Sequence, residues 1–381
     1  MGPPCRGACA SGDEAHNFGL LHRRALIVFV LAAPAVFAVA GCGGGGRPSF
    51  AQLQWSDDDP AWAPSGREVF FDSNRAGTRA ERNTDEGYSV YAMRIDGGGL
   101  RRLTRGDACN DQYPDPSPND QAIAFIRTCQ TGDLWVVARG GGRSKMLTTR
   151  VEEAAWSSDG RLLAVTRDRN ALDPFSGSDL WVVATRDGQM RLLARGVGME
   201  KSIGGFAWSR DGRRLAFGCR GGSLCVADVR TGTVGRLHRF KRGDDVSWVA
   251  WSPDDKQLAF VDGNGGSYDP NYSAWVMAAD GKHARQLPRY GEGNIWDVEW
   301  LPGRPQVLLV NTDYGKAYLV RADGTHKHDL PFEVDDITAS PDGKAVLLVQ
   351  RVFDSEGTYD HSTISLANLK TGHVRQLTQL P

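Results

Sequence analysis

The sequence predicts an all-β fold, and two observations lead to this prediction. Glycine is abundant, at 46 of 381 residues, and many glycines follow aspartate in pairs that favour tight turns between short strands. The stretch AWSSDGRLLAV at 155–165 returns as AWSRDGRRLAF at 207–217 and as AWSPDDKQLAF at 250–260. An aromatic residue, a turn and an apolar run therefore form a unit that the chain repeats.

The repeat occurs seven times when the chain is aligned with its own motif. The positions that align with the tryptophan, 39 to 54 residues apart, are Trp62, Pro116, Trp156, Trp208, Trp251, Trp300 and Ala339. Periods in this range are typical of propeller blades. We therefore predict a seven-bladed β-propeller of four-stranded antiparallel blades over residues 51–381.

The third copy illustrates the four strands expected in each blade. Strands are predicted over 152–157 and 161–166, joined by a Ser-Asp-Gly turn, and over 179–184 and 190–194, joined by an Arg-Asp-Gly turn. The aromatic residue before the first turn is large enough to pack between neighbouring blades. Because one such sheet cannot bury both of its faces alone, the blades are expected to close into a ring.

The N-terminus has the pattern of an exported lipoprotein. A His-Arg-Arg segment precedes the apolar run 25–40, which is short for a membrane span of about 20 residues, and VAGC ends this region at 39–42. VAGC resembles the lipobox of bacterial lipoproteins, in which the cysteine carries lipid. The resemblance implies a lipoprotein signal peptide over 1–41, lipidation of Cys42 and a glycine-rich tether over 42–50. A plain secretory peptide with a chance cysteine is the alternative.

Four further cysteines remain, and an even number in an oxidising compartment favours disulfides. Spacing alone leaves three connectivities open. The blade pattern brings Cys109 and Cys129 to the same end of the second blade, and Cys219 and Cys225 flank one hairpin of the fourth. We predict the pairs Cys109–Cys129 and Cys219–Cys225, with four buried thiols as the alternative.

The repeats resemble those of a known family. Cores of the WSPDG type are followed by segments such as DGGGLRRLT at 96–104. Together they resemble the WD-like propeller repeats of the TolB family over roughly residues 55–381. The chain departs from that family in having seven copies rather than six and in lacking a counterpart of its N-terminal α/β domain. The resemblance therefore implies the repeat type and not a role in the Tol system.

Acidic and aromatic residues gather at one predicted end of the propeller. The turns after the first and third strands are short, whereas connections after the second strands are long, as at 74–87 and 262–272, and function belongs where loop length varies. At this end we predict a binding surface made of Asp111, Tyr113, Glu152, Glu153, Asp244, Asp245, Trp248, Trp296, Asp297, Asp335 and Asp336. Inward-facing carboxylates would attract a cation or a basic peptide to the channel mouth. Alternatively, these acids cap the starts of strands and bond arginines between blades.

Composition and motifs favour a binding protein over an enzyme. A net charge of −1 argues against an extended basic face for nucleic acid, and no G-x-S-x-G nucleophile motif occurs. We therefore expect a monomeric, lipid-anchored scaffold on the extracytoplasmic side of a bacterial membrane, without catalytic residues, metal or cofactor. Its expected partner is an envelope protein or a basic peptide. The alternative is a calcium-dependent hydrolase or lactonase with its site in the central channel, because carboxylates are suitable calcium ligands.

Overall fold

The computed structural model describes residues 56–76, 87–105, 109–169, 177–197, 205–240, 245–263, 272–288, 294–304, 307–312, 315–353 and 359–378. The expected signal peptide, Cys42 and the tether lie outside these residues, as does Asp244. Among the described residues, no helix is long and apolar enough to cross a bilayer.

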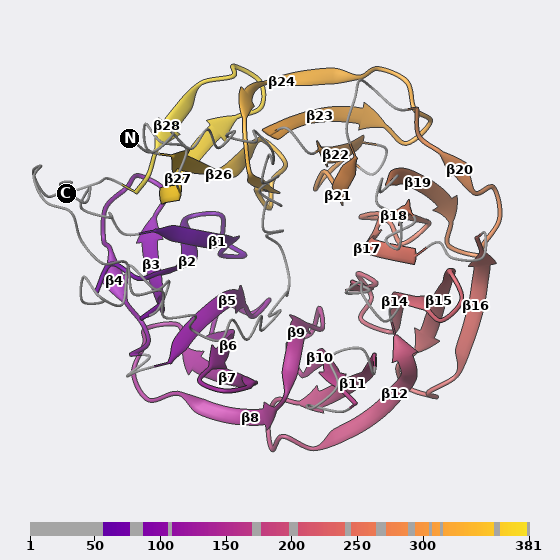
Figure 1. Ribbon diagram of the computed structural model, residues 1–381, viewed down its shortest axis with the longest axis horizontal. Helices are drawn as coiled ribbons and strands as arrows, with labels where there is room; N and C mark the ends of the chain where they lie inside the picture. The colour runs from indigo at the N-terminus through magenta and orange to yellow at the C-terminus, as the bar shows by residue number, and fades with distance from the viewer. Residues whose placement is uncertain are drawn as a thin grey trace, which may run out of the picture.

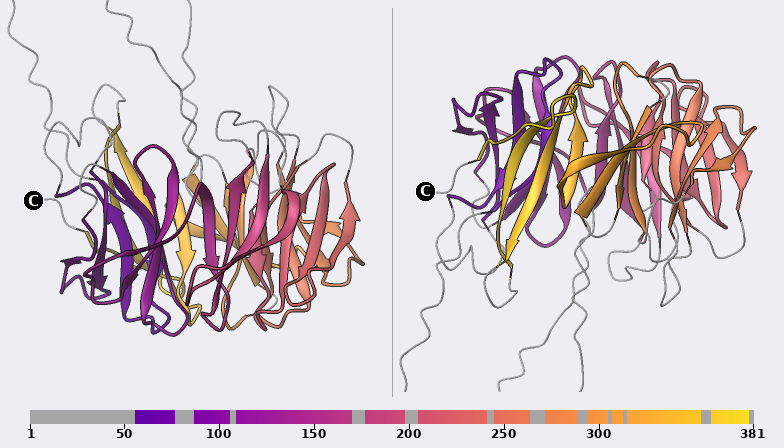
Figure 2. Two further views of the ribbon diagram at one scale, coloured as in Figure 1. Left: turned by 90° about the horizontal axis from the view of Figure 1, so that it is seen from below. Right: turned by 90° about the horizontal axis from the view of Figure 1, so that it is seen from above.

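Within those ranges, 28 strands form antiparallel sheets that follow one another around a central axis (Figure 1). Five sheets have four strands each, and each is built from four consecutive strands. Seen from the side, the strands run between the two faces of a disc (Figure 2). The fold is therefore all-β, with the four-stranded antiparallel sheets of a propeller.

The strands of the first half of the chain are β1 (Asp57–Trp62), β2 (Glu68–Ser73), β3 (Ser89–Arg94), β4 (Arg101–Arg102), β5 (Asn110–Pro116), β6 (Ala122–Thr128), β7 (Gly132–Ala138), β8 (Lys145–Thr149), β9 (Val151–Trp156), β10 (Leu162–Asp168), β11 (Ser178–Ala184) and β12 (Met190–Val197). Those of the second half are β13 (Phe206–Trp208), β14 (Arg214–Cys219), β15 (Ser223–Asp228), β16 (Val234–Arg239), β17 (Asp245–Trp251), β18 (Gln257–Gly263), β19 (Ser273–Ala278), β20 (Arg285–Gln286), β21 (Ile295–Trp300), β22 (Val307–Thr312), β23 (Lys316–Arg321), β24 (His328–Glu333), β25 (Asp336–Ala339), β26 (Ala345–Phe353), β27 (Tyr359–Asn368) and β28 (Val374–Gln376).

One sheet departs from the four-strand pattern. β9–β12 and β13–β16 are joined into a single eight-stranded sheet, because Val197 in β12 pairs with Cys219 in β14. Apart from this pair, β13 to β16 pair in chain order, as the strands of the other sheets do. The sheet thus consists of two four-stranded series that share one bridge.

The Ser-x-Asp turns between the first and second strands form by local hydrogen bonding. In the turn after β9, Ser157 Oγ donates to the Asp159 carboxylate at 2.7 Å and accepts from Leu162 N at 3.0 Å. Gly160 adopts a left-handed φ of 69°, which L residues other than glycine rarely adopt. The same serine-to-aspartate bond recurs at Ser209, Ser252 and Ser340. The motif thus forms the same turn in four of the repeats.

In five repeats, the tryptophan joins one four-stranded series to the neighbouring series. The indole Nε1 donates to a backbone carbonyl of that series from Trp156 (2.8 Å), Trp208 (3.0 Å), Trp251 (3.1 Å), Trp300 (3.1 Å) and Trp62 (3.2 Å). Where Ala339 replaces the tryptophan, its backbone N instead donates to Glu299 Oε2 at 3.2 Å. The expected packing of the aromatic residue between sheets therefore includes a specific hydrogen bond.

The first and last sheets meet without a shared strand in the described part of the chain. Trp62 Nε1 donates to Thr338 O, and Ser362 Oγ in β27 donates to Asp58 Oδ1 at 2.7 Å. A buried apolar cluster spans the same junction, with Phe71 and Ile364 among its members. Side-chain packing and hydrogen bonds thus connect the two ends of the series.

Both predicted disulfides are present. Cys109 is bonded to Cys129 with a Cα–Cα distance of 4.6 Å, and Cys219 to Cys225 with 5.9 Å. The first ties the start of the second sheet to the end of β6. The second bridges β14 and β15 near their hairpin turn.

Candidate functional site

Three innermost strands carry a bulge in which one residue adopts a left-handed φ. The pairing register shifts between Asp58 and Ala61, between Gln112 and Asp115 and between Ser247 and Ala250. Asp59, Tyr113 and Trp248 occupy these bulges with left-handed φ values of 47°, 57° and 49°. Such values are strained for residues other than glycine, and bulges next to functional sites redirect side chains. The three positions are equivalent in the repeat.

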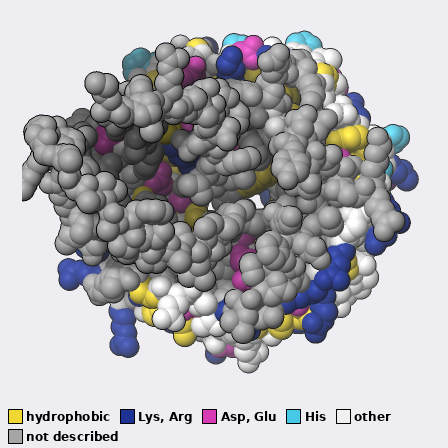
Figure 3. Space-filling model, in the orientation of Figure 1, with side chains coloured by type: hydrophobic (Ala, Val, Ile, Leu, Met, Phe, Trp, Pro, Cys, Tyr) yellow, Lys and Arg dark blue, Asp and Glu magenta, His cyan; other side chains and the backbone are white. Residues whose placement is uncertain are grey.

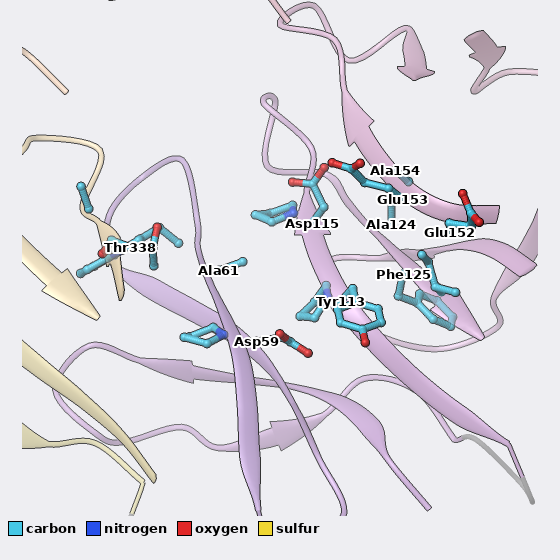
Figure 4. Close-up of a pocket in the computed structure, with 16 residues that line it drawn as sticks. Asp59, Ala61, Tyr113, Asp115, Ala124, Phe125, Glu152, Glu153, Ala154 and Thr338 are labelled. Carbon is cyan, nitrogen blue, oxygen red and sulfur yellow. Dashed lines mark hydrogen bonds between the residues drawn. The ribbon is translucent and has the colours of Figure 1, made fainter. Parts of the chain in front are cut away.

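Two of these three residues line a cavity of about 290 Å³ beside the channel. Its walls come from β1, β5, β6, β9 and β25, and four carboxyl groups contribute to them, those of Asp59, Asp115, Glu152 and Glu153. In Figure 4, Asp115 and Glu153 point toward one another, and Asp59 and Tyr113 lie together on the other side of the cavity. The cavity is therefore acidic, with one phenol among the carboxyls.

Glu152 is held in its neutral form at physiological pH. Burial and, to a lesser extent, the Asp168 carboxyl next to it raise its pKa to about 8, against the opposing effect of a hydrogen bond from Ser178. Ser178 Oγ lies 2.5 Å from Glu152 Oε2. A carboxylic acid with such a pKa can donate a proton near neutral pH, as a general acid must.

A second group of carboxyls backs the Asp59 side of the cavity. Asp72 in β2 is fully buried, and its pKa lies well above the usual range because of burial and of the neighbouring Asp59 and Asp58 carboxyls. Asp58 accepts hydrogen bonds from Ser362 Oγ at 2.7 Å and from Tyr88 Oη at 3.3 Å. The Asp72 carboxyl therefore stays protonated beside Asp59, whose side chain reaches the cavity.

The structure divides the predicted binding residues among different environments. Tyr113, Glu152 and Glu153 line the acidic cavity, as predicted for the channel. Trp248 and Asp297 line a second cavity, of about 570 Å³, together with the tryptophans of the repeat motif. Figure 3 shows acidic side chains around the central opening, while most visible Lys and Arg side chains lie toward the rim.

Other predicted residues have the alternative role in strands and ion pairs. Asp111 is fully buried and forms two hydrogen bonds with the Arg127 guanidinium, at 2.6 and 2.8 Å. Asp335 is exposed and accepts from Arg351 N at 2.6 Å. Asp336 is buried and accepts from the backbone N of the following residue at 2.7 Å. The side chains of Asp245 and Trp296 lie outside the described part of the structure, although their strands are described.

The sequence analysis missed several residues of the site. Asp59 and Asp115 lie beside its predicted residues in the innermost strands, but Asp72, Asp168 and Ser178 come from second and third strands. The sequence marks the first two bulges only by a proline after the bulged residue, in Asp-Pro at 59–60 and Tyr-Pro at 113–114. Proline indicates an interrupted strand because it cannot donate to a strand ladder.

The residues present do not form a calcium site. In the described part of the chain, no three His, Cys, Asp or Glu side chains are grouped so that they could hold a metal ion. We therefore derive no chemistry through a metal.

Solved structures of similar fold identify the chain as a propeller. An oligogalacturonate lyase in complex with manganese is 14% identical, with a TM-score of 0.61. The match covers 84% of this chain and 91% of the lyase chain. The β-propeller domain of the trilobed protease from Pyrococcus furiosus is 12% identical, with a TM-score of 0.61 and coverage of 86% and 97%. Acylaminoacyl peptidase from Pyrococcus horikoshii has the same TM-score and identity, but only 53% of its chain is matched.

Sequence relatives are matched over only part of their length. No family model matches the chain. An uncharacterized peptidase, YuxL of Bacillus subtilis, is 25% identical over 209 residues, which are 53% of this chain and 29% of that protein. The chain thus spans less than a third of this relative, and an uncharacterized protein from Agrobacterium fabrum is matched over 20% of its length. TolB from Acinetobacter baumannii is also similar, at 16% identity and a TM-score of 0.48. The expected propeller fold is supported by the solved structures with a TM-score of 0.61.

These comparisons correct the expected function. The prediction of a scaffold without catalytic activity is wrong, because the similar proteins include a lyase, an acylaminoacyl peptidase and a relative named as a peptidase. They favour the alternative, an enzyme, over a scaffold. The prediction took the lack of a G-x-S-x-G motif as an argument against catalysis, whereas the acidic cavity contains a carboxyl group of raised pKa, that of Glu152.

Proposed function

We propose that the protein is a hydrolase whose active site is the acidic cavity. The observation that carries this proposal is the neutral Glu152 carboxyl in a wall that also holds Asp59, Asp115 and Glu153. Hydrolysis by general acid and base needs two groups in opposite protonation states on one substrate. The cavity supplies one acid of suitable pKa and further carboxyls close to it.

In the proposed mechanism, Glu152 gives its proton to the leaving group as the scissile bond breaks. A carboxylate of the opposite wall takes a proton from the attacking water. Asp59 suits this role, because the neutral Asp72 can donate a hydrogen bond to it and leave it ionised. Asp115 is held in place by the backbone N of Trp156, 3.1 Å from its Oδ2. It would therefore shape the cavity rather than move a proton.

The charge of the cavity limits the substrate class. Four carboxyl groups with no Lys or Arg among the described lining residues repel polyanions. An oligogalacturonate would therefore bind poorly here, although the fold is similar to that of an oligogalacturonate lyase. We propose small uncharged or cationic substrates with an ester, lactone or amide bond, and peptides are included because two of the similar proteins are named as peptidases.

Two structural features belong to the same proposal. We propose that the eight-stranded sheet counts as two blades, so that seven blades close the ring through the Trp62 and Ser362 hydrogen bonds.

We also propose that Cys42 carries lipid and anchors the enzyme outside the cytoplasm. The VAGC motif supports the anchor, and two disulfides fit an oxidising compartment. Mass analysis of the N-terminal peptide from cells would detect the lipid, and an unmodified Cys42 there would contradict the anchor.

The catalytic proposal is tested with purified protein and a panel of chromogenic esters, lactones and aminoacyl anilides. Glu152→Gln is expected to lower kcat/KM by about a hundredfold or more, because removing a general acid typically costs that much. Glu333→Gln, on the exposed side of β24, is the matched control and should leave kcat/KM unchanged. For the wild type, kcat/KM should fall as the pH rises through about 8. An activity that Glu152→Gln retains in full would overturn the proposed role of this residue.

A further inference from the structure

A second polar cavity, with the opposite charge, lies away from the acidic one. It has a volume of about 420 Å³ and is lined by the end of the first sheet, at 102–105, and by residues of the second sheet, among them Arg127, Trp135 and Ser144. Three of its described lining residues are arginines and none is acidic. A volume of this size falls in the range of small-molecule sites, roughly 300 to 1,000 Å³.

The Arg102 guanidinium donates its hydrogen bonds to neutral acceptors, which do not neutralise its positive charge. Its Nε donates to the backbone O of Thr104 at 2.8 Å, and its Nη2 donates to Ser89 Oγ at 2.8 Å. Among the described residues, no carboxylate pairs with Arg102 or with the exposed Arg105. Two guanidinium groups thus remain as donors for an anion.

Arg127 is the third arginine of this wall, and its contacts hold neighbouring residues in place. Asp111 neutralises its charge, while its Nη2 also donates to the backbone O of Arg105 at 3.3 Å. Its guanidinium stacks on the Trp135 ring, 4.6 Å from the centroid. This arrangement fixes the backbone of Arg105 next to the cavity. The Cys109–Cys129 disulfide ties the chain shortly after Arg105 to the end of the strand that holds Arg127.

Arginine is suited to oxyanions because its planar fork matches the two oxygens of a carboxylate or phosphate. The Ser144 hydroxyl in the same wall adds a neutral donor. We propose that this cavity binds a small organic anion through Arg102 and Arg105, with a carboxylate or phosphate as the recognised group. The site is separate from the acidic cavity, so this proposal does not depend on the proposed hydrolase activity.

Calorimetric titration tests the site with three probes of one size, namely glucuronate, glucose 6-phosphate and glucose. One of the two anions should bind, glucose should not, and added salt should weaken binding because the contact is between charges. The preferred anion identifies the recognised group. If glucose binds as tightly as either anion, or if neither anion binds at millimolar concentration, the proposal is wrong.

Variants separate the arginines from general surface charge. Arg105→Met should weaken anion binding about tenfold or more, because a charge-assisted hydrogen bond is lost. Its side chain is exposed, so folding should not change. Arg102→Met should act in the same direction. Arg161→Met is the control, since this side chain is 85% exposed in another sheet. Equal weakening by the control and by Arg105→Met would overturn the site.

Discussion

Replacing Glu152 with glutamine should stabilise the protein at alkaline pH and leave it unchanged in acid. The pKa of Glu152 rises from 4.5 in the unfolded chain to about 8 in the folded one. The folded state therefore keeps a proton that the unfolded state has lost between these values, and stability falls as the pH rises through this window. Each pKa unit corresponds to 1.36 kcal/mol, so the free energy of unfolding of the wild type falls by up to about 5 kcal/mol by pH 8. This is an upper limit.

Urea unfolding of wild type and Glu152→Gln, followed by tryptophan fluorescence at about pH 5 and about pH 8.5, measures this difference. Glutamine has the shape of the neutral acid but no proton to lose, so the two midpoints should nearly coincide in acid. At alkaline pH the variant should unfold at higher urea, with the same m value. A variant that is destabilised equally at both pH values would refute the reasoning. A gain in stability together with a loss of activity would mark Glu152 as a strained functional group.

Three further substitutions test contacts within one sheet or between sheets, each by urea unfolding at neutral pH. Trp300→Phe removes a hydrogen bond to the preceding sheet and should cost about 1 to 3 kcal/mol; no measurable loss would show that this bond contributes nothing. Asp111→Ala leaves the Arg127 charge without its partner and should cost about 3 to 5 kcal/mol, whereas a cost below about 1 kcal/mol would mean that water replaces the carboxylate. Ser362→Ala at the junction of first and last sheets should cost about 1 to 3 kcal/mol, and a stabilised variant would argue against this bond as part of the closure.

The sequence predicted the repeated strands well, because their signals are local. The strands expected over 152–157 and 179–184 are observed as Val151–Trp156 and Ser178–Ala184. The turn between the first two strands depends on a serine, an aspartate and a glycine within five residues. Such patterns can be read from one copy and checked in the next. The single bridge from Val197 to Cys219 could not be foreseen, because it depends on how two neighbouring sheets approach each other.

The candidate site was only partly predictable, because its residues are brought together by the ring. Glu152 was chosen for its position near an innermost strand, yet its raised pKa depends on Asp168 and on burial that a sequence does not display. Asp111 looked equivalent in sequence but pairs with Arg127. Trp248 lies in a bulge that no proline marks and lines the second cavity. A count of acidic residues therefore does not distinguish the structural role of each member.

The protonation of Glu152 can be measured without knowing a substrate. In protein labelled with ¹³C at the glutamate carboxyls, the Glu152 signal is the one missing from Glu152→Gln, and its chemical shift can be followed against pH. The proposed active site requires a midpoint near pH 8, well above the ordinary value of 4.5. A midpoint close to 4.5 would mean that Glu152 is ionised at neutral pH and cannot serve as the general acid.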